Sequence, residues 1–213
     1  MSTTVLITGA TGLVGKALVK RCLSQGFKVH YLTTRKSKIT LQENYKGFYW
    51  NPQLDSIDIS CFEGVDIVIN LAGSSIAQRW TKASKSLILS SRKKALELLH
   101  SSIETHNFRV KHIISASAIG VYPDSKTRYY EEDFQGTDVS FLRTVVRSWE
   151  GALKPFKSLG IKTTALRIGI VLDTHEGALP KISGPIKAYI GSALGSGDQW
   201  QSWIHIDDLV RMF

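Results

Sequence analysis

A glycine-rich segment near the N-terminus carries the clearest chemical signal of the chain. Residues 8–15 read TGATGLVG and directly follow the apolar run VLI. Glycines at this spacing allow a tight turn, a close approach of the backbone to a pyrophosphate, and close packing of a helix on a strand. The N-terminus of that helix offers unpaired N–H groups and a positive dipole end to phosphates. The alternative is a turn without a ligand. The segment predicts a dinucleotide site formed by Gly9, Thr11, Gly12, Leu13, Val14 and Gly15.

The residues after the second predicted strand distinguish between the two nicotinamide dinucleotides. In NAD-selective folds, an acidic residue roughly 20 residues beyond the glycines accepts the ribose 2′-OH. Here no Asp or Glu lies between the glycine turn and Glu43. Thr34 and Arg35 stand there instead, followed by further cations, and they suit a 2′-phosphate. A solvated basic turn is the alternative. The pattern favours NADP(H) as the cofactor.

Composition and charge argue against several classes of protein, including nucleic-acid-binding and membrane-spanning proteins. The 213 residues, 43% of them hydrophobic, are enough for one large α/β domain. The net charge of +9 comes from dispersed cations without a nucleic-acid-binding signature, so we expect no nucleic-acid partner. No window approaches the roughly 18 apolar residues of a membrane span. Six scattered histidines have no ligand spacing, so no metal site is expected. We expect a cytoplasmic protein, because the first strand begins almost at Met1.

Alternating strand and helix patterns predict a doubly wound parallel sheet, the α/β fold of Rossmann type. From residue 170 onward, glycines and prolines interrupt a segment with only brief helical runs. We therefore expect an NADP(H)-binding domain at 1–169 and a small, irregular, partial substrate-side lid at 170–213. The predicted strands are residues 4–8, 28–34, 47–50, 65–71, 110–115 and 162–168, and the predicted helices are 13–25, 81–106 and 140–158.

Several further motifs occur in a familiar order. They are NLAG at 70–73, RW at 79–80, SSR at 90–92, SASAIGVY at 115–122, WE at 149–150, RIGIVL at 167–172 and WIHIDDL at 203–209. Together with the glycine turn, they resemble the YfcH-like epimerase family, an atypical branch of the extended short-chain dehydrogenases/reductases related to NAD-dependent epimerases/dehydratases. The resemblance implies a Rossmann-type fold and NADP(H) binding. Family members continue into a further C-terminal segment, so the chain looks truncated.

The resemblance also implies roles for single residues. Thr34 and Arg35 match positions that take the adenosine phosphate, and Val171 matches a residue near the nicotinamide. Arg92 matches a helix arginine that faces the cofactor, with a plain surface charge as the alternative. Leu71, Ala72 and Gly73 match the turn that runs under the cofactor ribose. Ser115, at the end of the fifth strand, completes the expected set of cofactor-binding residues.

The usual catalytic pair of this superfamily is missing. Its Tyr-x-x-x-Lys lies on the helix after the fifth strand, where the lysine depresses the tyrosine pKa. In the register set by the WE motif, these positions hold Leu142 and Val146, which transfer no proton. A Tyr-x-x-x-Lys string at 122–126 falls in a turn rather than a helix. Ser117 and Tyr122 remain as the catalytic candidates.

Three readings of function follow. The chain is an oxidoreductase that acts on an unknown small carbonyl compound, an epimerase for a sugar-type substrate, or a non-catalytic NADP(H)-binding sensor or scaffold. Hydride transfer itself needs only the nicotinamide and a well-placed carbonyl. The expected partners are a small-molecule substrate and, through the two long helices, a second copy in a homodimer.

Overall fold

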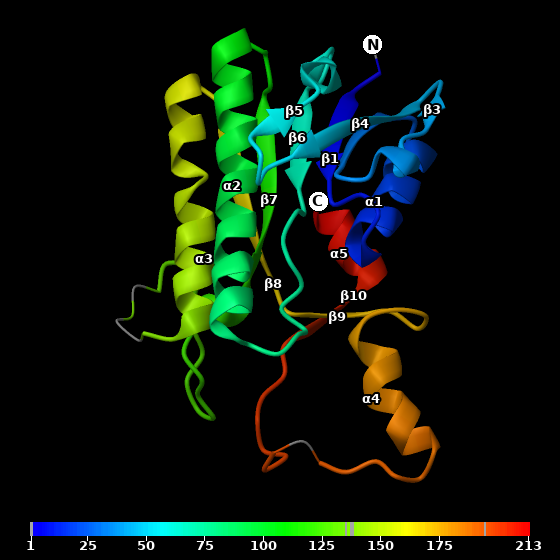
Figure 1. Ribbon diagram of the computed structural model, residues 1–213. Coiled ribbons are helices and arrows are strands. Elements are labelled where there is room, and N and C mark those ends of the chain that lie inside the picture. Colours follow the sequence, from blue (N-terminus) through cyan, green and yellow to red (C-terminus); the bar gives the residue numbers. More distant parts are fainter. Residues whose placement is uncertain (1, 135, 137–138, 194) are drawn as a thin grey trace.

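A parallel sheet forms the centre of the computed structural model, which describes residues 2–134, 136, 139–193 and 195–213 (Figure 1). Its parallel strands lie in the order β4-β2-β1-β6-β7-β8, and the order reverses between β1 and β6. Ligands of doubly wound folds bind at this reversal, beyond the carboxyl ends of the strands. The strands are β1 (Thr4–Thr8), β2 (Lys28–Thr33), β4 (Tyr45–Asn51), β6 (Ile67–Asn70), β7 (His112–Ala118) and β8 (Lys162–Ile168), with short antiparallel additions at β3 (Leu41–Gln42) and β5 (Ser56–Ile57).

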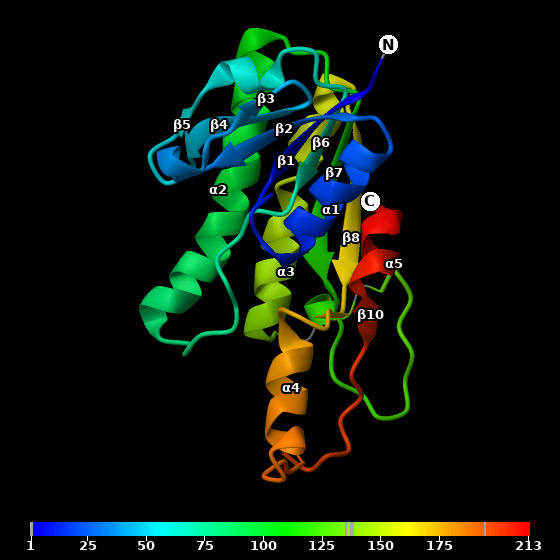
Figure 2. The same cartoon turned by 90° about the vertical axis from the view of Figure 1, so that its right-hand side faces the viewer.

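Helices cover both faces of the sheet, as Figures 1 and 2 show. α2 (Lys82–His106) and α3 (Phe141–Gly151) lie on one face, whereas α1 (Leu13–Ser24) and α5 (Ile206–Met212) lie on the other. Because side chains alternate along a strand, β1 supplies Leu6 to the α2/α3 core and both Val5 and Ile7 to the α1/α5 core. The predicted α/β fold of Rossmann type is confirmed.

Several predicted elements have other bounds than expected: the strands predicted at 47–50 and 65–71 are Tyr45–Asn51 and Ile67–Asn70, and two further elements differ more. The helix predicted at 140–158 stops at Gly151, and Lys154–Leu159 forms a separate 3-10 helix. Pro155 at the start of that segment lacks the N–H that a continuing α-helix needs. The fifth strand begins two residues later than predicted and extends to Ala118, so Ser117 lies within it. Other 3-10 turns are Lys36–Lys38, Ile59–Phe62 and Ile119–Val121.

The segment after residue 169 departs from the sheet. β9 (Ile170–Leu172) and β10 (Trp203–His205) pair in parallel as a small second sheet. Between them α4 (Ala178–Lys187) projects away from the body (Figure 1), and it contains no buried residue. α4 is longer than the brief helical runs expected here. α5 then returns the chain to α1. The division at 169/170 remains a proposal.

The outward sides of α2 and α3 carry polar groups. Lys93, Glu97, Thr144 and Arg147 are all exposed there, so a homodimer through this face would bring charged side chains together. The homodimer remains a prediction. Over the part of the chain that the structure describes, no helix combines the length and apolarity needed to span a membrane.

Candidate functional site

The glycine turn between β1 and α1 is closed by its own backbone. Gly9 has a left-handed φ of +68°, and its carbonyl accepts a hydrogen bond from the Gly12 N–H at 3.0 Å. A Cβ at position 15 would lie 2.2 Å from the Gly9 oxygen and 2.6 Å from the Ala10 Cα. The turn therefore tolerates no side chain at Gly15, as expected where a backbone wraps a pyrophosphate against a helix N-terminus. The residues present fit a dinucleotide.

A buried hydrogen-bond network fixes this turn to the neighbouring strand ends. The Thr8 hydroxyl donates to Asn70 Oδ1 at 2.8 Å and accepts from the N–H groups of Leu71 and Ala72, each at 3.0 Å. Asn70 Nδ2 in turn donates to the Ser115 hydroxyl at 3.1 Å. Hydrogen bonds between side chains thus connect the carboxyl ends of β1, β6 and β7. Sequence reasoning assigned no role to Thr8 and Asn70, although a polar residue that ends a buried apolar strand was the available signal.

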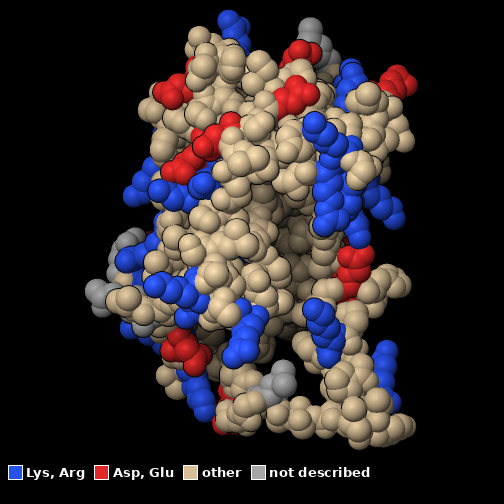
Figure 3. Space-filling model, in the orientation of Figure 1, with Lys and Arg blue, Asp and Glu red and all other residues tan. Residues whose placement is uncertain are grey.

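A cavity of about 560 Å³, here called the basic cavity, opens beside the turn. Arg35 and Lys38 provide its cations, and no described lining residue is acidic. Lys36 instead lies 5.2 Å above the Tyr49 ring, outside this lining. Figure 3 shows a hollow on this face of the molecule with Lys and Arg side chains along one side. Of the predicted cofactor residues, the cavity brings together Gly9, Thr11, Thr34, Arg35, Ala72 and Gly73.

Arg92 is partly buried and is not a freely exposed surface charge. Its guanidinium donates to the carbonyl oxygens of Ser74 and Ile88 at 3.0 and 2.9 Å, and it stacks 4.9 Å from the centre of the Trp149 ring. Burial lowers the pKa of Arg92 from its ordinary value. A Cβ on Gly73 would come within 3.1 Å of the guanidinium carbon, so the turn after β6 packs directly on this arginine.

A second cavity of about 850 Å³, here called the aromatic cavity, continues from Arg92. The end of β7, one face of α3 and the start of β9 form its walls, and Trp200 closes part of its rim. Tyr122 lines it, and so do Leu142 and Val146. The two positions where the superfamily pair is expected therefore present apolar side chains to the cavity. The string at 122–126 lies outside any helix, as the sequence predicted.

The two catalytic candidates meet in one polar network. The Ser117 hydroxyl donates to Glu150 Oε1 at 2.6 Å. Arg167 donates to both oxygens of the same carboxylate, at 2.9 Å each, and through Nη1 to the Tyr122 hydroxyl oxygen at 2.8 Å. Burial by itself would raise the pKa of Glu150, but the hydrogen bonds from Arg167 and Ser117 outweigh it and lower that pKa. The hydrogen bonds that Arg167 donates to Glu150 raise the pKa of Arg167. Sequence reasoning missed Glu150 and Arg167 as members of the site.

Comparison with known proteins now identifies the family. Residues 5–143 match the NAD dependent epimerase/dehydratase family. The chain belongs to this family. An epimerase family protein of Staphylococcus saprophyticus is 38% identical over 206 residues, which are 97% of this chain and 68% of that protein. The resemblance drawn from the motifs is confirmed.

Solved structures of the epimerase family share the fold. The human epimerase family protein SDR39U1 (isoform 2), solved with NADPH, superposes with a TM-score of 0.80 at 27% identity, covering 98% of this chain and 68% of that one. A nucleoside-diphosphate sugar epimerase from Corynebacterium glutamicum gives a TM-score of 0.82 at 29% identity, covering 100% of this chain and 43% of that one.

Some predicted residues of this epimerase-family chain lie outside both cavities. Among the residues that the structure describes, the predicted site residues that line neither of them are Gly12, Leu13, Val14, Gly15, Leu71, Ser115, Ser117 and Val171. Ser115 is fully buried and donates to the Ala116 carbonyl at 3.0 Å. Val14 and Val171 pack against the α1/α5 core. The cofactor contacts expected of Ser115, Val14 and Val171 remain predictions. The catalytic role expected of Ser117 also remains a prediction.

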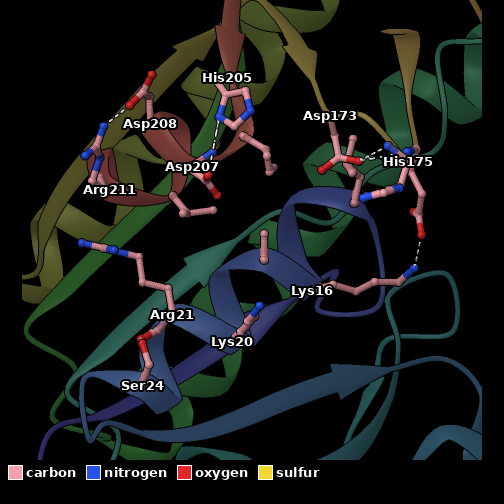
Figure 4. Close-up of a pocket in the computed structure, with 15 residues that line it drawn as sticks. Lys16, Lys20, Arg21, Ser24, Asp173, His175, His205, Asp207, Asp208 and Arg211 are labelled. Carbon is pink, nitrogen blue, oxygen red and sulfur yellow. Dashed lines mark hydrogen bonds and ion pairs between the residues drawn. The ribbon is translucent and has the colours of Figure 1, made fainter. Parts of the chain in front are cut away.

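A third cavity, of about 790 Å³, lies between α1 and α5 (Figure 4). Lys16 of α1 pairs with Glu176 at 2.7 Å, and Arg211 pairs with Asp208 within α5. His205 accepts a hydrogen bond from the Asp207 N–H at 3.2 Å and so caps α5. Of the predicted site residues this cavity contains Leu13. The Lys16–Glu176 pair thus links α1 to the β9–α4 connection, whereas α5 packs against α1 through apolar side chains such as Ile206 and Val210.

Proposed function

We propose that this chain binds NADP(H) and is an oxidoreductase or epimerase-like enzyme acting on a small carbonyl or sugar-type compound. One observation carries the proposal: a closed glycine turn opens into the basic cavity, where Thr34, Arg35 and Lys38 stand and no described lining residue is acidic. A 2′-phosphate would find charge-assisted hydrogen bonds there, and a carboxylate that repels it is missing from that lining. The relative solved with NADPH supports the same choice.

The aromatic cavity supports redox chemistry on the substrate side. Bound NADP(H) would supply or accept a hydride. Reduction of a carbonyl also needs a proton for its oxygen, and Leu142 and Val146 cannot give one. Tyr122 lines the cavity with a phenol whose oxygen accepts from Arg167. Among the described residues its O–H has no acceptor, so it can point at a substrate. Arg167 holds the phenol in place, and Glu150 with Ser117 holds Arg167.

One observation favours a non-catalytic binder as the second candidate. The Ser117 hydroxyl, which would help to polarise a carbonyl, donates at 2.6 Å to Glu150 and lies outside the cavity lining. A sensor or scaffold needs the basic cavity but no proton donor. Steady turnover of NADPH with any carbonyl compound, abolished in Tyr122→Phe, would decide for the enzyme.

The first test is calorimetric titration with NADPH and, separately, with NADH. Arg35→Asp should weaken NADPH binding by about 10- to 100-fold, because a hydrogen bond to a charged group contributes about 1.5–3 kcal/mol. NADH binding should change little. Lys36→Asp is the matched control, since Lys36 stacks on Tyr49 and lies outside the basic cavity. Equal losses for both dinucleotides in Arg35→Asp would contradict the phosphate assignment.

A further inference from the structure

The aromatic cavity also indicates which class of substrate the chain takes. We propose that it binds a flat, apolar carbonyl compound, such as an aromatic aldehyde, ketone or quinone, in preference to a sugar nucleotide. This inference rests on the proposed function, because the compound would be reduced beside bound NADPH. Four features of the cavity support it: an apolar wall, aromatic rings in the lining, cations that already have partners, and the Tyr122 phenol that Arg167 holds.

The inner wall of the cavity is apolar and rigid. Leu142, Val145, Val146 and Trp149 follow the i, i+3, i+4, i+7 pattern that places them on one face of α3, and all four line the cavity. Val145, Val146 and Trp149 are between 2% and 7% exposed, so they are packed in place. Hydroxyl groups of a sugar laid against this wall would lose water without gaining partners, which is costly.

The polar groups around the cavity are largely engaged within the protein. Arg92 donates to two backbone carbonyls and stacks on Trp149. Lys126 pairs with Asp198 at 3.3 Å, and Trp200 Nε1 donates to the Lys126 carbonyl at 3.2 Å. A sugar nucleotide needs cations for its diphosphate and donors and acceptors for its hydroxyls, and these side chains would have to leave existing partners to provide them.

Aromatic rings form another part of the lining. Tyr122 and Tyr130 stack with 5.9 Å between ring centres and 14° between ring planes. The exposed Arg128 guanidinium lies 5.4 Å from the Tyr130 ring centre, which extends this flat surface. Offset stacking on such rings favours a planar ligand. The cavity volume of about 850 Å³ falls within the range of about 300–1,000 Å³ typical of small-molecule pockets.

The same geometry gives a balanced reduction. The carbonyl carbon takes the hydride that bound NADPH supplies, and the carbonyl oxygen takes the phenol proton of Tyr122. The carbonyl would become an alcohol, the bound NADPH would be left as NADP⁺, and a solvent proton would restore the Tyr122 phenol. Arg167, whose Nη1 donates to the phenol oxygen, stabilises the Tyr122 phenolate until it is reprotonated.

The test compares 4-nitrobenzaldehyde with UDP-glucose as ligands of the whole chain. NADPH binding is measured first by calorimetry, and each compound is then titrated into the NADP⁺-saturated protein. We expect the aldehyde to bind at least tenfold more tightly than UDP-glucose. Leu142→Asn should weaken aldehyde binding about tenfold or more, since it puts an amide into the apolar wall. Thr144→Asn, an exposed position on the same helix, should change nothing.

Each outcome has a distinct meaning. Tighter binding of UDP-glucose, above all if it depends on Arg128, overturns the inference. Equal aldehyde binding in Leu142→Asn and in the unaltered chain also overturns it, provided that NADP⁺ still binds the variant. If NADPH binds but titration of the aldehyde gives no heat of binding, only the proposed substrate class is refuted. If NADPH itself fails to bind, the proposed function fails, and the substrate class fails with it.

Discussion

Gly15 shows how one missing side chain determines the site. A Cβ there would overlap the Gly9 carbonyl oxygen and the Ala10 Cα, both of them backbone atoms that cannot rotate away. Gly15→Ala should therefore lower the free energy of unfolding by about 1–3 kcal/mol, the usual cost of overpacking. It should also weaken NADPH binding, because the turn must open to admit the methyl group. Urea unfolding and calorimetry measure the two effects.

Gly151 is the matched control for that prediction. It is the last residue of α3, and a Cβ built there meets no atom within 4 Å. Gly151→Ala should leave NADPH binding unchanged and should stabilise the protein slightly, by up to about 1 kcal/mol, because alanine has the better helix propensity. Similar losses in both variants would show that the crowding at Gly15 is not the cause.

At the scale of residues, the sequence reveals local chemistry better than long-range contacts. The glycine turn and the basic residues after β2 lie within short stretches, so their spacing alone indicates a phosphate site. Glu150 lies 33 positions from Ser117 and 17 from Arg167. Nothing in the spacing of these three shows that they meet. Their contact depends on β7 and β8 being neighbours, with Ser117 directly opposite Arg167 in the register.

The Glu150 carboxylate ties α3 to β8, and this contact should make stability depend on pH. The pKa of Glu150 is lowered from its ordinary 4.5 in the folded chain, so the unfolded chain binds more protons between the two pKa values. The stabilisation is complete above about pH 4.5 and is lost as the pH falls through the folded pKa. Glu150→Gln should lower the free energy of unfolding at pH 7 by about 1–3 kcal/mol. Its urea midpoint should also vary less between pH 7 and 3.

Glu97→Gln provides the comparison for the pH series. Glu97 pairs with Lys93 one turn away on the exposed side of α2, at 3.3 Å. Such helix-surface pairs contribute about 0.3–0.5 kcal/mol. We expect the urea midpoint of Glu97→Gln to change between pH 7 and 3 as much as that of the unaltered chain. If the urea midpoint of Glu150→Gln still falls at low pH as much as that of the unaltered chain, other carboxylates cause the pH dependence of stability.

At the scale of elements, the order of strands and helices was predictable and several of their ends were not. Apolar runs separated by glycine and polar turns indicate β1, β2 and β6 directly. The end of α3 depends on Gly151 and Pro155, and helical periodicity alone does not reveal it. β7 continues to Ala118 because β8 pairs with it along seven residues. Such pairing is a property of the assembled sheet.

At the scale of the whole molecule, the sheet order follows from the fold class, but the cavities do not. The aromatic cavity takes its lining from residues near 76, 92, 118–130, 142–149, 168–170 and 200–202. These segments meet only after the parallel sheet has brought β7 and β8 together and β9 has turned the chain across their ends. The sequence predicted a lid after residue 169, without showing which of its side chains would face the cavity.

The projection of α4 yields a last prediction about the whole molecule. Ile190, just after this helix, is 78% exposed, and α4 itself contains no buried residue. Ile190→Lys should therefore change the free energy of unfolding by less than about 0.5 kcal/mol, as surface substitutions usually do. Binding of a hydrophobic dye should fall, because the exposed apolar surface shrinks. By contrast, Ile103→Ala, at a residue of α2 that is 2% exposed, should cost about 2–5 kcal/mol. If Ile190→Lys lowers the free energy of unfolding about as much as Ile103→Ala does, Ile190 packs against another surface in solution. Sedimentation at several protein concentrations would then test whether that surface belongs to a second copy.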